Sequence, residues 1–156
     1  MSEMRESSAR CVALTQEHRG HGVSTAAYYL ARALVSEGLR VLLIDLTGRR
    51  SRLQSLLARG PAKNLGIWTP PIPRPADLPM LLDQARQQTR GRVDVLLVDA
   101  DQALLEHAGG LAAGFDYIIP VVEPTEAGQS AADRIGVRLG DDLPPYGRIG
   151  VVFSRV

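Results

Sequence analysis

The sequence predicts an α/β domain in which helices cover both faces of a mainly parallel sheet. Short runs that are nearly continuous in valine, isoleucine and leucine alternate along the chain with stretches of helical periodicity. Such runs are typical of strands that are buried on both faces, as in parallel sheets. Strand–helix–strand units in this order connect in a right-handed sense. Because 156 residues suit one domain with a proper core, we expect residues 1–156 to form a single domain.

Each expected element has its own pattern. Runs such as "CVALT", "RVLLID" and "YIIPVV" predict strands at residues 11–15, 40–45, 93–100, 117–122 and 149–154. Helical patterns predict helices at residues 24–38, 76–90 and 127–140. In the first helix the apolar residues Ala27, Leu30 and Leu34 recur at helical spacing, and Gly38 is a typical C-terminal stop.

Residues 59–76 form the least regular stretch, with five prolines and the only tryptophan, Trp68. Prolines exclude a central strand and favour extended or polyproline-like backbone. Trp68 either belongs to the core of the domain or serves as a docking anchor. Rigid proline segments and tryptophan present contact area at low entropic cost, so this stretch is the best candidate for partner contact.

Composition excludes several function classes. The formal net charge of +1 gives no electrostatic case for binding nucleic acid or an anionic membrane. The polar start "MSEMRESSAR" lacks the apolar stretch of a signal peptide, and no run of 18 apolar residues exists for insertion into a membrane. We therefore expect a cytoplasmic protein. The single cysteine, Cys11, opens an apolar run and is expected to be a buried thiol.

A glycine-containing loop lies between the first expected strand and the first expected helix. Gly20 and Gly22 offer bare backbone, and Ser24 and Thr25 follow them. A loop in this position aims backbone N–H groups and the helix dipole at one point, which creates an anion site. Phosphate-binding loops place a lysine against the phosphates and a hydroxyl on magnesium. Here Val23 stands where that lysine would lie.

This loop and the segment "EGLRVLLIDL" make the sequence resemble the deviant-Walker P-loop ATPases of the MinD/ParA type. Within them it is most similar to the cytoplasmic domain of the bacterial tyrosine kinases (BY-kinases) that serve capsule and exopolysaccharide synthesis. Those proteins carry a Gly-x-Gly-Lys-Ser-Thr loop, matched here by Gly20, Gly22, Ser24 and Thr25. The resemblance covers almost the whole chain and implies a P-loop NTPase-like fold.

Other family motifs are kept only in part. In "DLTGR", Asp45 and Arg49 match the second acidic motif, but Thr47 replaces its second acid. The strand "VLLVDADQ" keeps the Walker B residue Asp99 without the usual proline, and Ser154 replaces an asparagine associated with the adenine. The resemblance implies that Ser24, Asp45 and Asp99 serve magnesium binding and hydroxyl activation in active relatives.

The departures fall at the functional positions. Val23 replaces the loop lysine, and the upstream signature lysine of the ParA type is His18. A substitute cation could come from Arg19, inside the loop, or from Lys63, the only lysine, although arginine and lysine are not interchangeable at a tight site. We expect Gly20, Gly22, Val23, Ser24 and Thr25 to form a vestigial nucleotide loop.

The remaining candidate residues have structural interpretations. Asp45 and Asp99 are expected to be vestigial carboxylates at strand ends, hydrogen-bonded to loop N–H groups. We expect no functional metal, so that Ser24 and Asp45 would be a vestigial magnesium site. His18 and His21 are too few ligands for zinc, and His107 is expected on a helix surface. Of the neighbouring tyrosines Tyr28 and Tyr29, one is expected to face inward and one outward.

These observations favour a binding module over an enzyme. We expect a catalytically degenerate BY-kinase-like pseudokinase, without ATP or another cofactor, that regulates exopolysaccharide or capsule biosynthesis and export. Its expected partner is a membrane polysaccharide co-polymerase or export protein, which would hold it at the inner membrane without insertion. Two alternatives remain: a weakly or fully active ATPase or tyrosine kinase that uses Mg-ATP, and a MinD/ParA-like positioning protein. Homo-oligomerisation remains open.

Overall fold

The computed structural model describes residues 9–16, 23–46, 63–70, 77–101, 114–140, 148–149 and 152–153. The strands are β1 (Arg10–Thr15), β2 (Val41–Asp45), β3 (Leu65–Trp68), β4 (Val95–Asp101), β5 (Tyr117–Val122), β6 (Arg148–Ile149) and β7 (Val152–Phe153). The helices are α1 (Val23–Ser36), α3 (Leu78–Thr89) and α5 (Glu126–Gly140). The elements expected from the sequence are therefore present, with ends shifted by a few residues.

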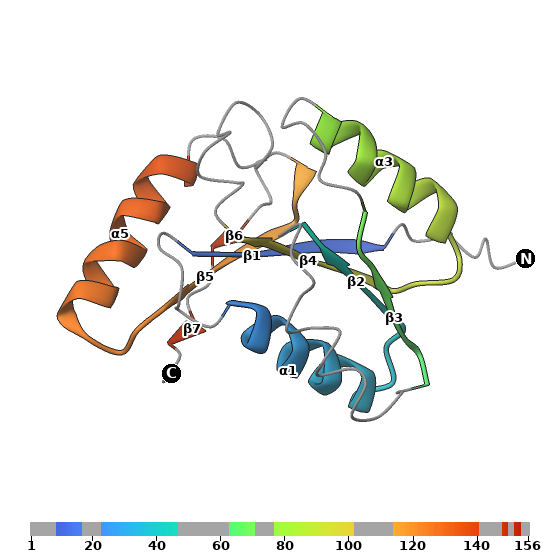
Figure 1. The fold of residues 1–156 in the computed structure, drawn as a ribbon, viewed down its shortest axis with the longest axis horizontal. Helices are drawn as coiled ribbons and strands as arrows, with labels where there is room; N and C mark the ends of the chain where they lie inside the picture. Colours follow the sequence, from blue (N-terminus) through green and yellow to red (C-terminus); the bar gives the residue numbers. More distant parts are fainter. Residues whose placement is uncertain are drawn as a thin grey trace, which may run out of the picture.

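One parallel sheet organises the molecule, with the strand order β3-β2-β4-β1-β5-β6 and with β7 also paired to β5. The connection from β1 to β2 skips one position, which β4 later fills (Figure 1). As a result, the carboxyl ends of β1, β2 and β4 lie side by side at one edge of the sheet. This arrangement confirms the predicted α/β fold with a parallel sheet.

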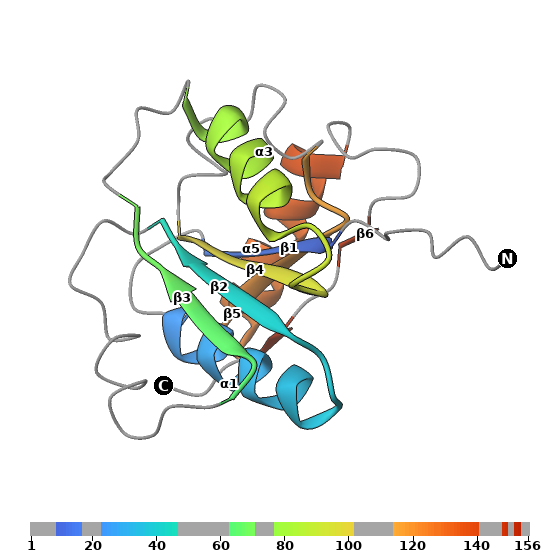
Figure 2. The ribbon, with the colours of Figure 1, turned by 90° about the vertical axis from the view of Figure 1, so that its right-hand side faces the viewer.

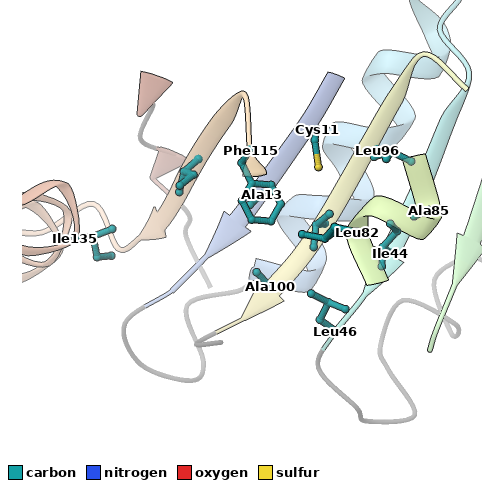
Figure 3. Packing of buried hydrophobic residues seen from close by; sticks show 12 residues of the cluster. Cys11, Ala13, Ile44, Leu46, Leu82, Ala85, Leu96, Ala100, Phe115 and Ile135 are labelled. Carbon is teal, nitrogen blue, oxygen red and sulfur yellow. The ribbon is translucent and has the colours of Figure 1, made fainter. Parts of the chain in front are cut away.

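Helices pack against both faces of the sheet, because alternate residues of each buried strand point to opposite sides. On one side, α1 buries Ala27, Tyr28 and Ala31 against strand residues that include Leu43 and Leu97. On the other side, Leu82 and Ala85 of α3 and Ile135 of α5 pack with Leu96 and Phe115. Figure 3 shows Leu82, Leu96 and Phe115 near β1 and β4, with Ile135 to one side, beside α5.

Helix α1 ends where the sequence predicted. Gly38 has a φ of 88°, a backbone conformation that favours glycine, and its N–H donates to the carbonyl of Val35. The N–H of Leu39 donates to the carbonyl of Leu34, which closes the helix end. Tyr28 is buried and Tyr29 is exposed, as expected of this pair. Cys11 is buried, also as expected.

The stretch 59–76 contains a strand that its sequence pattern did not predict. β3 runs through its middle and pairs in parallel with β2, from Leu65 opposite Val41 to Trp68 opposite Ile44. Among the described strands it is the outermost, so the prolines that flank it are compatible with the pairing. Figure 2 shows β3 at the margin of the sheet, between α3 and α1. Trp68 is half-buried against the α3-side core.

The last expected strand is represented by two short pieces. β6 pairs with Tyr117 and Ile118 of β5, and β7 pairs with Val121 and Val122. Both pairings have the same offset in residue number, so the two pieces continue one parallel register along β5. In the described part of the chain, no helix is both long enough and apolar enough to cross a membrane.

Candidate functional site

Polar side chains are buried at one edge of the sheet, at the carboxyl ends of its central strands. In the described part of the chain the buried polar or charged residues are Thr15, Gln16, Asp45 and Asp99. Thr15 is the last residue of β1, and Gln16 follows it. Asp45 is the last residue of β2, and Asp99 lies near the end of β4. In open α/β sheets, ligands bind outside the carboxyl ends of the strands, so this edge is the candidate site.

Asp45 and Asp99 are brought together by strand pairing. They are direct partners in the parallel register of β2 and β4, and both are completely buried. Alternation along the two strands places them on the same face as Leu43 and Leu97, which is the face that α1 covers. The pairing of these acids depends on β4 lying beside β2, which no local pattern in the sequence shows.

The first turn of α1 contacts Asp99, one of these two acids. Ser24 Oγ donates a hydrogen bond of 2.6 Å to Asp99 Oδ2. A hydroxyl and carboxylates at this spacing are the oxygen ligands that magnesium uses in proteins. The helix N-terminus adds a partial positive charge, which favours anions at the same place. Ser24, Asp45 and Asp99, all predicted from the sequence, therefore do meet in space.

Val23 lies at the first position of α1, and its side chain faces the core. Only 3% of the residue is exposed, and it packs in the same cluster as Leu14 and Ala27. A buried aliphatic group carries no charge and donates no hydrogen bond, so it cannot neutralise a phosphate. Thr25, the second hydroxyl residue after Val23, is half-buried.

The structure bears on one of the two substitute cations, Lys63. Lys63 comes just before β3, and the parallel pairing of Leu65 with Val41 puts it near the amino ends of the strands. From Val41 to Asp45 the strand spans about 13 Å, at about 3.3 Å per residue. Lys63 therefore lies beyond the opposite edge of the sheet from Ser24 and Asp99, and this observation argues against it as a phosphate ligand.

Several predicted positions lie outside the described residues. They are Gly20, Gly22, His18, Arg19, His21, Thr47, Arg49, His107 and Ser154. The conformation of the glycine loop and the role of Arg19 therefore stay predictions. Within the part of the chain that the structure describes, no group of three or more histidine, cysteine, aspartate or glutamate residues could hold a metal ion.

Two residues near the strands were not predicted as part of any site. Thr15 and Gln16 are buried beside the carboxyl end of β1, where they enlarge the polar group at this edge. The sequence signal for them was their place at the end of an apolar run and before the glycine loop. A polar residue at the carboxyl end of a buried parallel strand lies at the edge of the sheet where ligands bind in open α/β folds.

Comparisons with known proteins give structural relatives. No known protein family profile matches the sequence, and no curated protein matches it either. Among solved structures, a ParA family ATPase from Chlorobium tepidum TLS has a TM-score of 0.71 at 18% identity, covering 95% of this chain and 76% of that one.

Two further solved structures share the fold. The septum site-determining protein MinD from Pyrococcus horikoshii OT3, complexed with Mg-ADP, has a TM-score of 0.68 at 16% identity, over 93% of this chain and 70% of that one. The BceF tyrosine kinase domain has a TM-score of 0.59 at 24% identity, over 93% of this chain and 69% of that one. The chain thus shares the α/β fold of these three solved structures, which are a ParA family ATPase, a MinD protein and a tyrosine kinase domain.

Proposed function

We propose that this chain is a catalytically degenerate P-loop protein, a BY-kinase-like pseudokinase that acts by binding a partner. The observation that carries the proposal is the place of Val23 at the first position of α1. Its side chain is 3% exposed and belongs to the apolar core on the α1 face. The position that a lysine holds in the loop motif is here part of the packing of the domain.

The charge at the candidate site supports weak or absent nucleotide binding. Asp45 and Asp99 contribute two buried carboxylates close to the helix N-terminus. Phosphoryl-transfer sites offset the charge of the phosphates with a lysine and magnesium. With Val23 in place of lysine, and Lys63 beyond the other edge of the sheet, neither of these two positions supplies a cationic side chain there. We therefore propose that the protein works without ATP.

A constant docking function is what remains when nucleotide switching is lost. In this proposal the partner is a membrane polysaccharide co-polymerase or export protein, and the chain regulates exopolysaccharide or capsule production from the inner membrane surface. The similarity of the loop and the first strand–helix–strand unit to the BY-kinases supports the polysaccharide context. The BceF tyrosine kinase domain among the structural relatives is consistent with it.

One observation favours a second candidate, a weakly active ATPase or kinase. The 2.6 Å contact between Ser24 Oγ and Asp99 Oδ2 keeps together a hydroxyl and a carboxylate, two oxygen groups that can bind magnesium. If magnesium joins this pair, a cation supplied by Arg19 would complete a minimal phosphate site. A third candidate, a positioning protein of the MinD/ParA type, draws support from the plasmid partition protein from Borrelia burgdorferi, which shares the fold at a TM-score of 0.69.

Calorimetry with Mg-ATP separates the first two candidates. We expect no heat of binding at micromolar concentrations of nucleotide, and no release of phosphate. Ser24→Ala is the matched control, because it removes the remaining magnesium-type hydroxyl and leaves Val23 unchanged. Micromolar affinity with turnover, abolished by Ser24→Ala, would show an active enzyme and contradict the proposal.

Complementation of a deletion strain tests the polysaccharide role. We expect deletion to lower or alter exopolysaccharide, and both Asp45→Asn and Asp99→Asn to restore it, because the carboxylates serve no chemistry. Thermal melting of each purified variant verifies that it is folded. If both folded variants fail to restore polymer, the carboxylates act in catalysis. If deletion leaves polymer unchanged but displaces a cellular structure, the positioning candidate holds instead.

A further inference from the structure

A cleft lies at the amino ends of β2, β3 and β4, at the edge of the sheet opposite the candidate nucleotide site. Its volume is about 280 Å³. The lining residues are Arg40, Val41, Leu42, Asn64, Leu65, Gly66, Arg92 and Val93. The cleft is slightly smaller than sites for small organic ligands, which occupy about 300 to 1,000 Å³. It suits one or two side chains of a peptide better than a whole small molecule.

The cleft borders the outermost strand of the sheet. β3 pairs with β2 on one side, and no other described strand pairs with its outer side. Figure 2 shows this margin beside β2. Outer strands offer unpaired N–H and C=O groups, and extended peptides add to such edges as a further strand.

Gly66 shapes the cleft at this margin. It is exposed, and it stands opposite Leu42 in the parallel register. A Cβ added at Gly66 would lie 3.3 Å from Leu42 Cδ1, so any side chain here would occupy the space above Leu42. A peptide residue paired opposite Gly66 on the outer side would project onto the same face, because cross-strand partners share a face. Its side chain would then enter the space that glycine leaves.

The charges around the cleft are basic. Asp94, the nearby acid, is held by Arg40: the Arg40 Nη2 to Asp94 Oδ1 distance is 3.1 Å, and the Arg40 N–H donates to Asp94 Oδ2 at 2.8 Å. Arg92 is exposed, and its side chain has no hydrogen bond or ion pair with any described residue. Lys63, also exposed, precedes Asn64 in the chain. The positive charges of Arg92 and Lys63 are therefore available to a ligand.

From these observations we propose that β3 and the adjoining cleft bind an extended acidic segment of a partner protein. The segment adds as a strand to the outer side of β3, places an apolar side chain over Gly66, and pairs a carboxylate with Arg92. Main-chain hydrogen bonds supply affinity, and the cleft and the basic rim supply selectivity. This binding surface lies away from the candidate nucleotide site, and binding there does not depend on the polysaccharide assignment.

Fluorescence anisotropy with designed peptides tests the proposal on the full chain. The probe is a fluorescein-labelled peptide of alternating aspartate or glutamate and valine. One comparison peptide carries lysine at each acidic position, and another carries proline at alternate valines, which removes the N–H groups needed for strand addition. We expect the acidic peptide to bind, and each comparison peptide to bind at least about tenfold more weakly.

Variants of the protein locate the site. Arg92→Glu is expected to weaken binding of the acidic peptide about tenfold or more. Arg90→Glu makes the same change in net charge two residues away, outside the cleft lining, and is expected to leave binding within about twofold. Gly66→Val should abolish binding by filling the cleft. If that variant does not fold, the two arginine variants still decide the question.

Four results would overturn the proposal. Equal losses in Arg92→Glu and Arg90→Glu would mean that only net charge matters. Equal binding of the proline peptide would exclude strand addition. Equally effective competition by inorganic phosphate would reduce the site to an anion site. Sedimentation showing a dimer that Gly66→Val disrupts, without peptide binding, would assign the edge to a second copy of this chain.

Discussion

Val23→Lys restores the loop lysine of active relatives and tests whether position 23 belongs to the core. Burial of a valine side chain contributes about 1.5 to 3 kcal/mol, and Val23 is 3% exposed. The ammonium would also face the partial positive charge of the α1 N-terminus, which costs about 0.3 to 1 kcal/mol. We therefore expect Val23→Lys to lower the free energy of unfolding by about 2 to 4 kcal/mol. We expect no gain in Mg-ATP affinity or activity, because Thr47 and Ser154 also differ from the family motifs.

Differential scanning fluorimetry and chemical denaturation measure this loss. For a chain of this size, it corresponds to a decrease in melting temperature of roughly 5 to 15 °C. Tyr29→Lys is the control, because Tyr29 lies on the same helix and is 63% exposed, and its substitution is expected to cost about 0.5 kcal/mol or less. An unchanged melting temperature for Val23→Lys, with a further increase on adding Mg-ATP, would mean that position 23 faces an open phosphate site, and our reasoning would be refuted.

Three other predictions follow from contacts in the structure. A double-mutant cycle of Ser24→Ala and Asp99→Asn, measured by urea denaturation, should give a coupling of about 1 to 2 kcal/mol, since a hydrogen bond to a carboxylate is lost; additive effects would contradict the 2.6 Å contact. Burial raises the pKa of Cys11 from 9.0 to about 12, so the unfolding free energy should fall as the pH rises from 9 toward 12, and Cys11→Ala should remove that part of the fall in denaturation curves. Arg40 lowers the pKa of Asp94, so the stability that this pair contributes is complete above about pH 4 and is lost as the pH falls further. Asp94→Asn should therefore reduce the fall in unfolding free energy below about pH 4, and an unchanged fall would exclude the pair as its cause.

Much of the fold follows from local patterns. Apolar runs of five to eight residues predicted the central strands, because a strand that is covered on both faces needs apolar residues at nearly every position. Tyr28 and Tyr29 fall on opposite sides of α1 because successive helical residues point in different directions, as the sequence indicated. β3 was missed, since an outer strand of four residues between prolines is stabilised by its pairing with β2 rather than by its own pattern.

The candidate site divides in the same way. The sequence alone determined which groups are available: the hydroxyl of Ser24, the carboxylates of Asp45 and Asp99, and valine in place of lysine at position 23. Only the tertiary structure decided that β4 lies between β1 and β2, which makes the two acids neighbours and brings Asp99 within 2.6 Å of Ser24. It also put Lys63 beyond the opposite edge of the sheet. Strand order depends on long-range packing and on the crossover connections, and neither of these leaves a periodic signal in the residues they bring together.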